Sequence, residues 1–311
     1  MKTQLFFFAV LASLTIAPAH AVILYGAENS ANLTNPGTGL PFDTVGRVSS
    51  AAGIEDGGSG VHLGGGYMIT AAHILQSQIN TVTFDSSTFH SRDMSFTPVQ
   101  IGSTDLRIFK LSSTPTVGAA QLYDGSAELL NDASLVGFGS GRKIGESINT
   151  NVVELAPGGS PLLKRWGMNQ PVSEVSAFSY TRNSETYTFD AIQTVLGNTQ
   201  GNPNDDGNGA FEAAAGPRDS GSGMFQLIDS AWYLTGITSV IFQQNANSIT
   251  FGNDVPAVIG AGSAAIPPGA GDPNLFVQIS SYSTQINTLV PEPSHSLLAL
   301  SSLVLLLRRR R

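Results

Sequence analysis

Three residues that lie far apart in the sequence, His73, Asp105 and Ser220, are of the types that together activate a serine hydroxyl. In such a set the imidazole takes the hydroxyl proton, and the carboxylate orients the imidazole and stabilises its charged form. Ser220 lies within residues 216–223, where glycines leave an oxygen exposed and backbone N–H groups free to face a developing oxyanion. Because runs of Asp, Ser and Gly are also ordinary turn sequences, this run alone does not establish catalysis.

The candidate base is one of three histidines between residues 22 and 290, which are His62, His73 and His90. His73 follows the apolar segment 67–72, which ends in small residues and would hold an imidazole at a strand end with space in front of it. His62 lies within a strand-like run and His90 in a polar loop. An ordinary buried histidine is the alternative interpretation of His73 taken in isolation.

The candidate carboxylate, Asp105, directly precedes the alternating run 106–111. An aspartate at the head of a strand can be buried enough to hold an imidazole in one tautomer, although turn and cap aspartates are common. The chain order His, Asp, Ser discriminates between folds. An α/β-hydrolase needs a histidine after Ser220, and none lies between Ser220 and residue 290. A subtilisin-like order needs the aspartate first, and Asp43 and Asp56 have no supporting motif.

Short strands are expected to position these side chains. Hydrophobic residues make up 41% and charged residues 12% of the 311 residues, with 34 glycines, 16 prolines and no cysteine. This composition is typical of a loop-rich, all-β protein that is stabilised by its core rather than by disulfides. Residues 282–289 predict a short closing helix. The predicted strands are residues 45–49, 61–63, 67–70, 81–84, 106–111, 134–138, 175–181, 186–189, 232–241, 248–251 and 275–279.

The beginning of the chain predicts a secretory signal peptide. Lys2 supplies the positive start, residues 5–16 the apolar segment, and Ala19-His20-Ala21 the small-residue cleavage site. Residues 1–21 would then be removed, and the mature chain would begin at Val22.

The end of the chain predicts a second sorting segment. Pro291-Glu292-Pro293 is followed by the largely apolar run 297–307 and by arginines at 308–311. That run is shorter than the roughly 20 residues that span a bilayer. Residues 290–311 resemble the PEP-CTERM sorting tail that an exosortase recognises in Gram-negative bacteria. The resemblance implies export to the cell surface or medium, transient membrane anchoring with the arginines inside, and removal of the tail.

The body of the protein is acidic. The chain has 15 basic and 23 acidic residues; without residues 1–21 and the tail, 10 basic and 22 acidic residues are left. The resulting net charge near −12 argues against nucleic-acid binding.

Three ordered segments resemble the signature segments of the trypsin-like serine peptidases: residues 70–73, Asp105-Leu106 and Asp219-Ser220-Gly221. Residues 137–139 are similar to the opening strand of that family's second barrel, and residues 234–239 to the strand that lines its substrate cleft. Residues 275–289 are similar to its last strand and helix.

The resemblance covers about residues 45–289. It implies an all-β fold of two Greek-key, six-stranded β-barrels with the active site between them, acting on protein or peptide substrates without a metal or cofactor. We expect an N-terminal arm at 22–44, the first barrel at 45–118, a linker at 119–131, and the second barrel with its helix at 132–290.

The resemblance makes Ser220 the nucleophile, His73 the base, and the backbone N–H groups of Arg218 and Ser220 the oxyanion hole. The family has glycine where this chain has Arg218, because the backbone turns tightly there. Two alternatives follow. Either the arginine is tolerated, or the peptide flips and the chain is a weak or inactive peptidase-like extracellular protein with a binding or structural role.

Counting from the nucleophile predicts the substrate-binding residues. Ala214 falls at the floor of the family's primary pocket, where an aspartate would demand Lys or Arg in the substrate. Ser239, Val240 and Ile241 fall on one wall, and Ile241 would narrow the pocket. We therefore expect small or medium apolar residues before the cleaved bond.

Two further motifs admit competing interpretations. In many members of the family a freed Ile or Val amino group pairs with the aspartate before the nucleophile, so Val22 is a candidate partner of Asp219, although the expected glycines do not follow it. Residues 202–209 have oxygen ligands at alternating positions, as calcium loops do, but lack the acidic first and twelfth residues. A solvated loop is the alternative, and no metal site is predicted.

Overall fold

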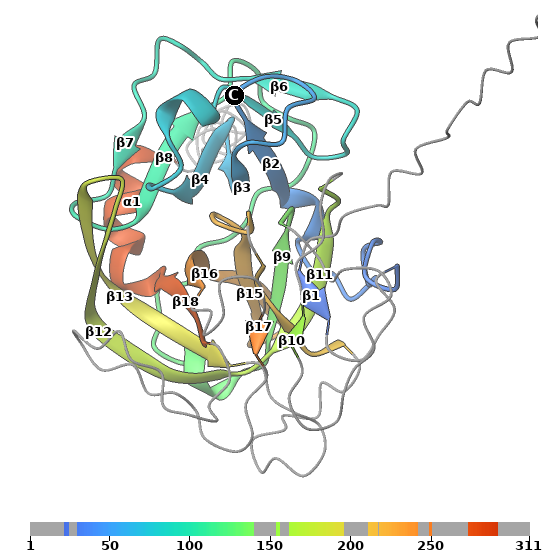
Figure 1. Cartoon of the computed structure of the whole chain (residues 1–311), viewed down its shortest axis with the longest axis vertical. Helices are drawn as coiled ribbons and strands as arrows, with labels where there is room; N and C mark the ends of the chain where they lie inside the picture. The colour runs from blue at the N-terminus through green and yellow to red at the C-terminus, as the bar shows by residue number, and fades with distance from the viewer. Residues whose placement is uncertain are drawn as a thin grey trace, which may run out of the picture.

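The computed structural model describes residues 22–24, 30–139, 154–155, 162–195, 211–216, 218–241, 249–250 and 273–291 (Figure 1). Both predicted sorting segments, apart from residues 290 and 291, and the candidate calcium loop lie outside the described residues. Within them, no helix is both long enough and apolar enough to cross a membrane.

The first sheet is antiparallel and has the strand order β6-β5-β2-β3-β4-β8-β7. Strands β2, β3 and β4 follow one another as neighbours, and β5 returns beside β2, which is a Greek-key arrangement. The strands are β2 (Val45–Ser49), β3 (Gly58–Gly64), β4 (Tyr67–Ala71), β5 (Thr81–Thr83), β6 (Phe89–Ser91), β7 (Val99–Gln100) and β8 (Leu106–Lys110).

The second sheet is also antiparallel and has the order β11-β9-β15-β16-β18-β13-β12. Its strands are β9 (Ala133–Gly137), β11 (Arg165–Asn169), β12 (Pro171–Arg182), β13 (Glu185–Val195), β15 (Gly223–Ile228), β16 (Ala231–Ile241) and β18 (Pro273–Gln278). Two short pairs accompany it, β1 (Ile23–Leu24) with β14 (Ala213–Ala214) and β10 (Glu154–Leu155) with β17 (Ile249–Thr250).

Helical structure is limited. Within the described residues the one α-helix is α1 (Ser283–Leu289), which buries Ile286. The 3-10 turns that lie wholly in the described residues are η1 (Phe42–Thr44), η2 (Gln76–Gln78), η3 (Glu128–Leu130) and η5 (Ser280–Tyr282). The predicted all-β fold with a short C-terminal helix is confirmed, and it is consistent with a two-barrel, chymotrypsin-like architecture.

Each sheet has seven strands in the described residues, where six were expected for each barrel. Edge strands such as β6 and β7 have three and two residues. Strands this short show too little alternation of apolar and polar residues to be counted from sequence.

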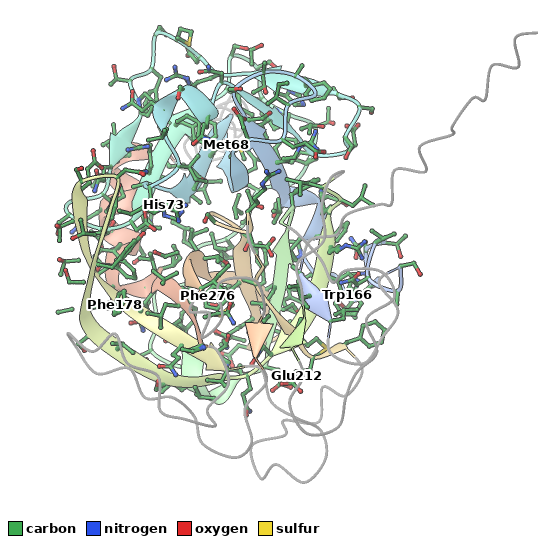
Figure 2. The ribbon with its side chains drawn as sticks, in the orientation of Figure 1. Met68, His73, Trp166, Phe178, Glu212 and Phe276 are labelled. Carbon is green, nitrogen blue, oxygen red and sulfur yellow. The ribbon has the colours of Figure 1, made fainter. Side chains whose placement is uncertain are left out.

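The largest hydrophobic cluster joins the two sheets. It contains Val61 and Ile108 from the first sheet, Phe225 and Val277 from the second, and Ile286 from α1, all fully buried. Burying such side chains contributes about 1.5–3 kcal/mol each. Figure 1 shows the two sheets facing each other, and in Figure 2 His73 lies at the boundary between them. Side chains from either sheet are thereby held in fixed positions at this boundary.

Residues 22–24 are the first described part of the expected N-terminal arm, and they pack into the fold. Val22, Ile23 and Leu24 are fully buried, and β1 pairs with β14. Three consecutive apolar side chains account for this, because leaving them exposed would forfeit their burial energy.

Candidate active site

His73 and Asp105 are brought together by two neighbouring strands. His73 follows β4 and Asp105 precedes β8, and Ala71 pairs with Leu106 across these strands. The His73 backbone N–H donates to Asp105 Oδ1 at 2.8 Å, and His73 Nδ1 lies 2.7 Å from Asp105 Oδ2. His73 is 4% exposed and Asp105 is fully buried. The carboxylate therefore fixes both the backbone and the ring of His73.

Ser220 completes a hydrogen-bonded chain with these residues. Its Oγ lies 2.7 Å from His73 Nε2. The Ser220 carbonyl accepts the Ser59 N–H from β3 at 2.8 Å, and the Gly221 N–H donates to Thr238 O of β16, also at 2.8 Å. The serine turn is thus attached to both sheets, and its hydroxyl faces the imidazole nitrogen that can take its proton.

Residues of the second sheet also hold Asp105 in place. Ser239 Oγ of β16 donates to Asp105 Oδ2 at 2.5 Å, and the Tyr180 hydroxyl of β12 donates to the same oxygen at 2.8 Å. Tyr180 Oη also lies 3.1 Å from His73 Nδ1. Burial is the main cause that raises the pKa of the Tyr180 phenol well above its ordinary range, and the nearby Asp105 charge is the second. The phenol therefore stays protonated and donates.

Sequence reasoning missed Tyr180. It lies near the tip of the β12–β13 hairpin, whose turn residues Asn183 and Ser184 have φ of +53° and +66°. Asn183 Nδ2 donates to the His73 carbonyl at 3.4 Å. Positive φ at both central residues is typical of a tight hairpin turn, and the Asn183-Ser184 pair is a weak signal for it. Nothing in the local sequence indicates that this tip reaches His73.

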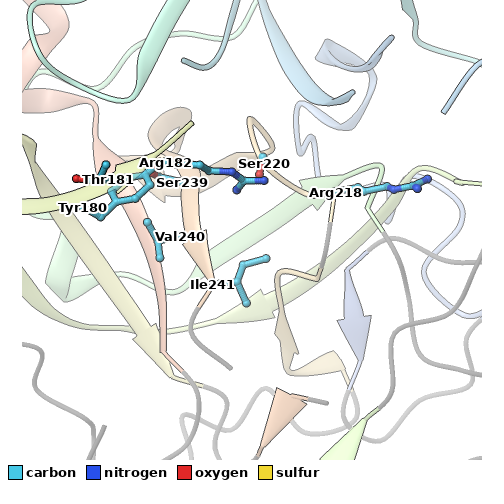
Figure 3. Close-up of a pocket in the computed structure, with 8 residues that line it drawn as sticks. All are labelled: Tyr180, Thr181, Arg182, Arg218, Ser220, Ser239, Val240 and Ile241. Carbon is cyan, nitrogen blue, oxygen red and sulfur yellow. The ribbon is translucent and has the colours of Figure 1, made fainter. Parts of the chain in front are cut away.

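Arg218 adopts a backbone conformation that usually requires glycine, with φ of +72°. Among the described residues, neither the Arg218 N–H nor the Ser220 N–H donates a hydrogen bond. The Arg218 side chain donates to the Glu55 carbonyl at 2.7 Å, and in Figure 3 it extends away from Ser220. The arginine is therefore accommodated without filling the space in front of the nucleophile.

Asp219 lies behind the serine turn and is fully buried. Its Oδ1 accepts the Gly139 N–H at 2.7 Å, while Oδ2 accepts the Gly216 N–H at 2.7 Å and the Val22 N–H at 3.2 Å. Burial raises the pKa of Asp219 to about 6, even though these three N–H groups favour its ionised form. A Cβ at Gly137 or Gly139 would collide with this carboxylate, which explains both glycines of that segment.

Two pockets have Ser220 in their walls. The first, of about 430 Å³, is called the β16 pocket, and it is lined by Tyr180, Thr181, Arg182, Arg218, Ser220, Ser239, Val240 and Ile241 (Figure 3). The second, of about 340 Å³, is called the His73 pocket, and it is lined by Asp56, Gly57, His73, Ile74, Leu75, Gln78, Arg182, Asn183, Arg218 and Ser220. An extended chain passing Ser220 could occupy both.

Three of the four predicted substrate-binding residues line the β16 pocket: Ser239, Val240 and Ile241. Ala214 does not line either pocket. It is fully buried, and its backbone pairs with Ile23, because β14 is occupied by the apolar β1. Among the described residues, no cluster of His, Asp and Glu is arranged to hold a metal ion.

No protein-family model and no curated protein matches the sequence. Similar solved structures include the inactive form of a serine-to-alanine mutant of Rv3671c from M. tuberculosis H37Rv, with 13% identity and a TM-score of 0.48, covering 88% of this chain and 100% of that one. The HtrA-type protease AlgW with a tripeptide is 15% identical with a TM-score of 0.45, covering 80% of this chain and 61% of AlgW. Identities this low leave the geometry of the site as the basis for a function.

Proposed function

We propose that this protein is a serine endopeptidase that cleaves peptide bonds through an acyl-enzyme. The observation that carries the proposal is the hydrogen-bonded chain from Asp105 through His73 to the Ser220 hydroxyl. Ser220 Oγ attacks the peptide carbonyl while His73 Nε2 takes its proton, and Asp105 stabilises the imidazolium. His73 then protonates the leaving amine, and water hydrolyses the ester by the same route.

The oxyanion that forms during attack would be bound by the backbone N–H groups of Arg218 and Ser220. Losing one such donor typically lowers the rate by about a hundred- to a thousandfold. The apolar walls formed by Val240 and Ile241 support a preference for small or medium apolar residues before the cleaved bond.

The same proposal includes the fate of the two ends. The signal peptide at 1–21 would direct export, and exosortase-type machinery would recognise the tail at 290–311 and release the protein to the cell surface or medium. The mature chain would comprise an arm at 22–44 and two barrels at 45–118 and 132–290, joined by a linker at 119–131.

A fluorophosphonate probe tests the chemistry, because it reacts with activated serines. We expect mass spectrometry to find the probe on Ser220 and labelling to disappear in Ser220→Ala and His73→Ala. The Ser281→Ala variant, which changes a serine near α1, should be labelled like the unaltered protein. Equal labelling of the unaltered protein and Ser220→Ala would contradict the proposal.

The second candidate function is that of an inactive peptidase-like binding protein. Arg218 favours it, because arginine stands where the family has glycine. Absence of labelling from a folded protein would support this alternative.

A further inference from the structure

Two arginines share the walls of both pockets with Ser220. Arg182, from the β12–β13 hairpin, and Arg218, from the serine turn, both line the β16 pocket and the His73 pocket. Both side chains are exposed. In Figure 3 the Arg182 guanidinium extends along the pocket toward Ser220. They are two of only ten lysines and arginines between residues 22 and 290 of an acidic protein, and among the described residues Asp56 is the one acidic residue that lines either pocket.

No acidic side chain in the described residues forms an ion pair with Arg182. Arg182 lies opposite Glu185 in the hairpin. Glu185 instead accepts a hydrogen bond from the Tyr187 hydroxyl at 2.7 Å. The Arg182 guanidinium is therefore available to a ligand that enters either pocket.

Glu55, which Arg218 contacts, and Asp56, which lines the His73 pocket with it, both have other partners. Arg218 donates to the Glu55 backbone carbonyl, which is neutral. The Glu55 carboxylate forms an ion pair with Arg47 at 2.7 Å. Asp56, on the wall of the His73 pocket, accepts the Ser50 N–H. Arg218 thus keeps donors and charge for a further partner.

The backbone conformation of Arg218 also supports a role for its side chain. At φ of +72° a side chain is strained, and glycine would relieve the strain. A strained residue beside a reactive group is a reason to look for a function in its side chain. Arginine adds a planar, permanently charged fork of N–H donors, whose geometry matches a carboxylate.

We propose that this cleft selects substrates that carry a carboxylate close to the cleaved bond, and that Arg182 and Arg218 bind it. This inference rests on the proposed peptidase function. The Val240 and Ile241 walls take the apolar side chain before the bond, and the arginines at the junction of the two pockets form charge-assisted hydrogen bonds with a neighbouring acidic residue. A terminal carboxylate would offer the same chemistry.

The test is a peptide series of one parent sequence in which Asp or Asn occupies each position from three residues before the cleaved bond to two after it. We expect kcat/KM to be about tenfold higher for Asp than for Asn at one or two positions. Arg182→Gln should reduce the Asp-to-Asn ratio of kcat/KM toward one, and Arg182→Lys should retain part of the preference for Asp. Lys110→Gln, which removes a basic residue outside both pockets, should leave the ratio unchanged.

A second arm distinguishes the source of the carboxylate. Peptides that end one or two residues after the cleaved bond are compared as free acids and as C-terminal amides. If only the free acids are cleaved faster, the arginines bind the C-terminal carboxylate of the peptide. If internal Asp is preferred, they bind an acidic side chain.

Peptide binding to a variant without the nucleophile tests the carboxylate site independently of peptide hydrolysis. The Ser220→Ala variant is titrated with the Asp and Asn peptides, and we expect tighter binding of Asp that is lost when Arg182→Gln is added. Hydrolysis with equal rates and equal binding for Asp and Asn would overturn the inference and leave the peptidase proposal standing. Preferential binding of Asp without hydrolysis or probe labelling would overturn the peptidase proposal and leave the carboxylate site.

Discussion

The Tyr180 hydroxyl donates a hydrogen bond of 2.8 Å to Asp105 Oδ2 across the boundary between the two sheets. Tyr180 belongs to β12 of the second sheet, whereas Asp105 precedes β8 of the first. Ser239 from β16 donates to the same oxygen. The carboxylate that orients His73 is therefore held from both sides, and the second sheet positions this residue of the first.

Replacing Tyr180 with Phe removes the hydroxyl and keeps the ring, which packs near Tyr187 and Phe189. We expect kcat to fall about three- to tenfold with little change in KM, because a hydrogen bond to a charged group that orients the base is lost while the pocket walls stay. Steady-state kinetics on a peptide substrate measure both. Tyr187→Phe removes a hydroxyl that binds Glu185 instead and should leave kcat unchanged. A rise in KM alone would show that Tyr180 contacts substrate rather than positioning Asp105.

Arg218→Gly tests the strain at the serine turn. A non-glycine residue in the left-handed region costs about 1 kcal/mol or more. We expect Arg218→Gly to be more stable than Arg218→Ala by about 1 kcal/mol in urea unfolding, since both lose the guanidinium and only glycine removes the strain. Equal stabilities would mean that the turn relaxes around the substituted residue.

The Val22 contact with Asp219 predicts an effect of the N-terminus on pH dependence. Burial raises the Asp219 pKa from 3.8 to about 6, so the ionised carboxylate is less favourable in the folded than in the unfolded chain. Stability should fall by about 3 kcal/mol as pH rises from about 4 to above 6 when residues precede Val22. A free Val22 ammonium 3.2 Å away would lower that pKa and reduce the loss.

Thermal unfolding between pH 4 and pH 8 measures this difference for two forms of the protein, one beginning at Val22 and one with a single extra residue before it. The melting temperature of the extended form should drop about 5–10 °C further. Parallel curves and equal peptidase activity for the two forms would exclude a pairing between the Val22 amino group and Asp219.

Gly221→Ala should inactivate the protein. Gly221 has φ of +82°, and a Cβ there would collide with the Ser59 carbonyl and the Thr70 hydroxyl. Because the serine turn is enclosed between β3 and β16, we expect loss of probe labelling and destabilisation of about 3 kcal/mol or more. Gly118→Ala is the matched control, since a Cβ at that position meets open space. Unchanged labelling of Gly221→Ala would show that the turn can move away from Ser59.

The sequence predicted the site where local pattern determines structure. The apolar strand Tyr67–Ala71 and the alternating strand Leu106–Lys110 were both predicted from their own residues, and His73 and Asp105 were joined by residue type, chain order and the family resemblance. The pairing of the two strands, which brings these residues into contact, was found only in the structure. Ser220 was identified by the small residues around it.

Features that depend on long-range pairing were not predicted. Tyr180 contacts Asp105 because the β12–β13 hairpin is long and turns near that residue. The alternation of side chains within the two strands specifies neither the length of the hairpin nor the position of its tip. Ala214 was assigned by counting back from Ser220. Its place in the fold is instead set by pairing with Ile23, about 190 residues earlier in the chain. The shortest edge strands were missed because two or three residues carry no periodicity.

The hairpin contact also has a consequence for folding kinetics. His73 and Tyr180 are separated by 107 residues, and Ser220 comes later still. Contacts of such high sequence separation are slow to form, because the entropy of closing a long loop must first be overcome. The first sheet can therefore form with His73 and Asp105 in place while the nucleophile is still absent. Under the proposed function, hydrolytic competence would be acquired only when the second sheet packs, and a partly folded chain would be protected from cleaving its own exposed segments.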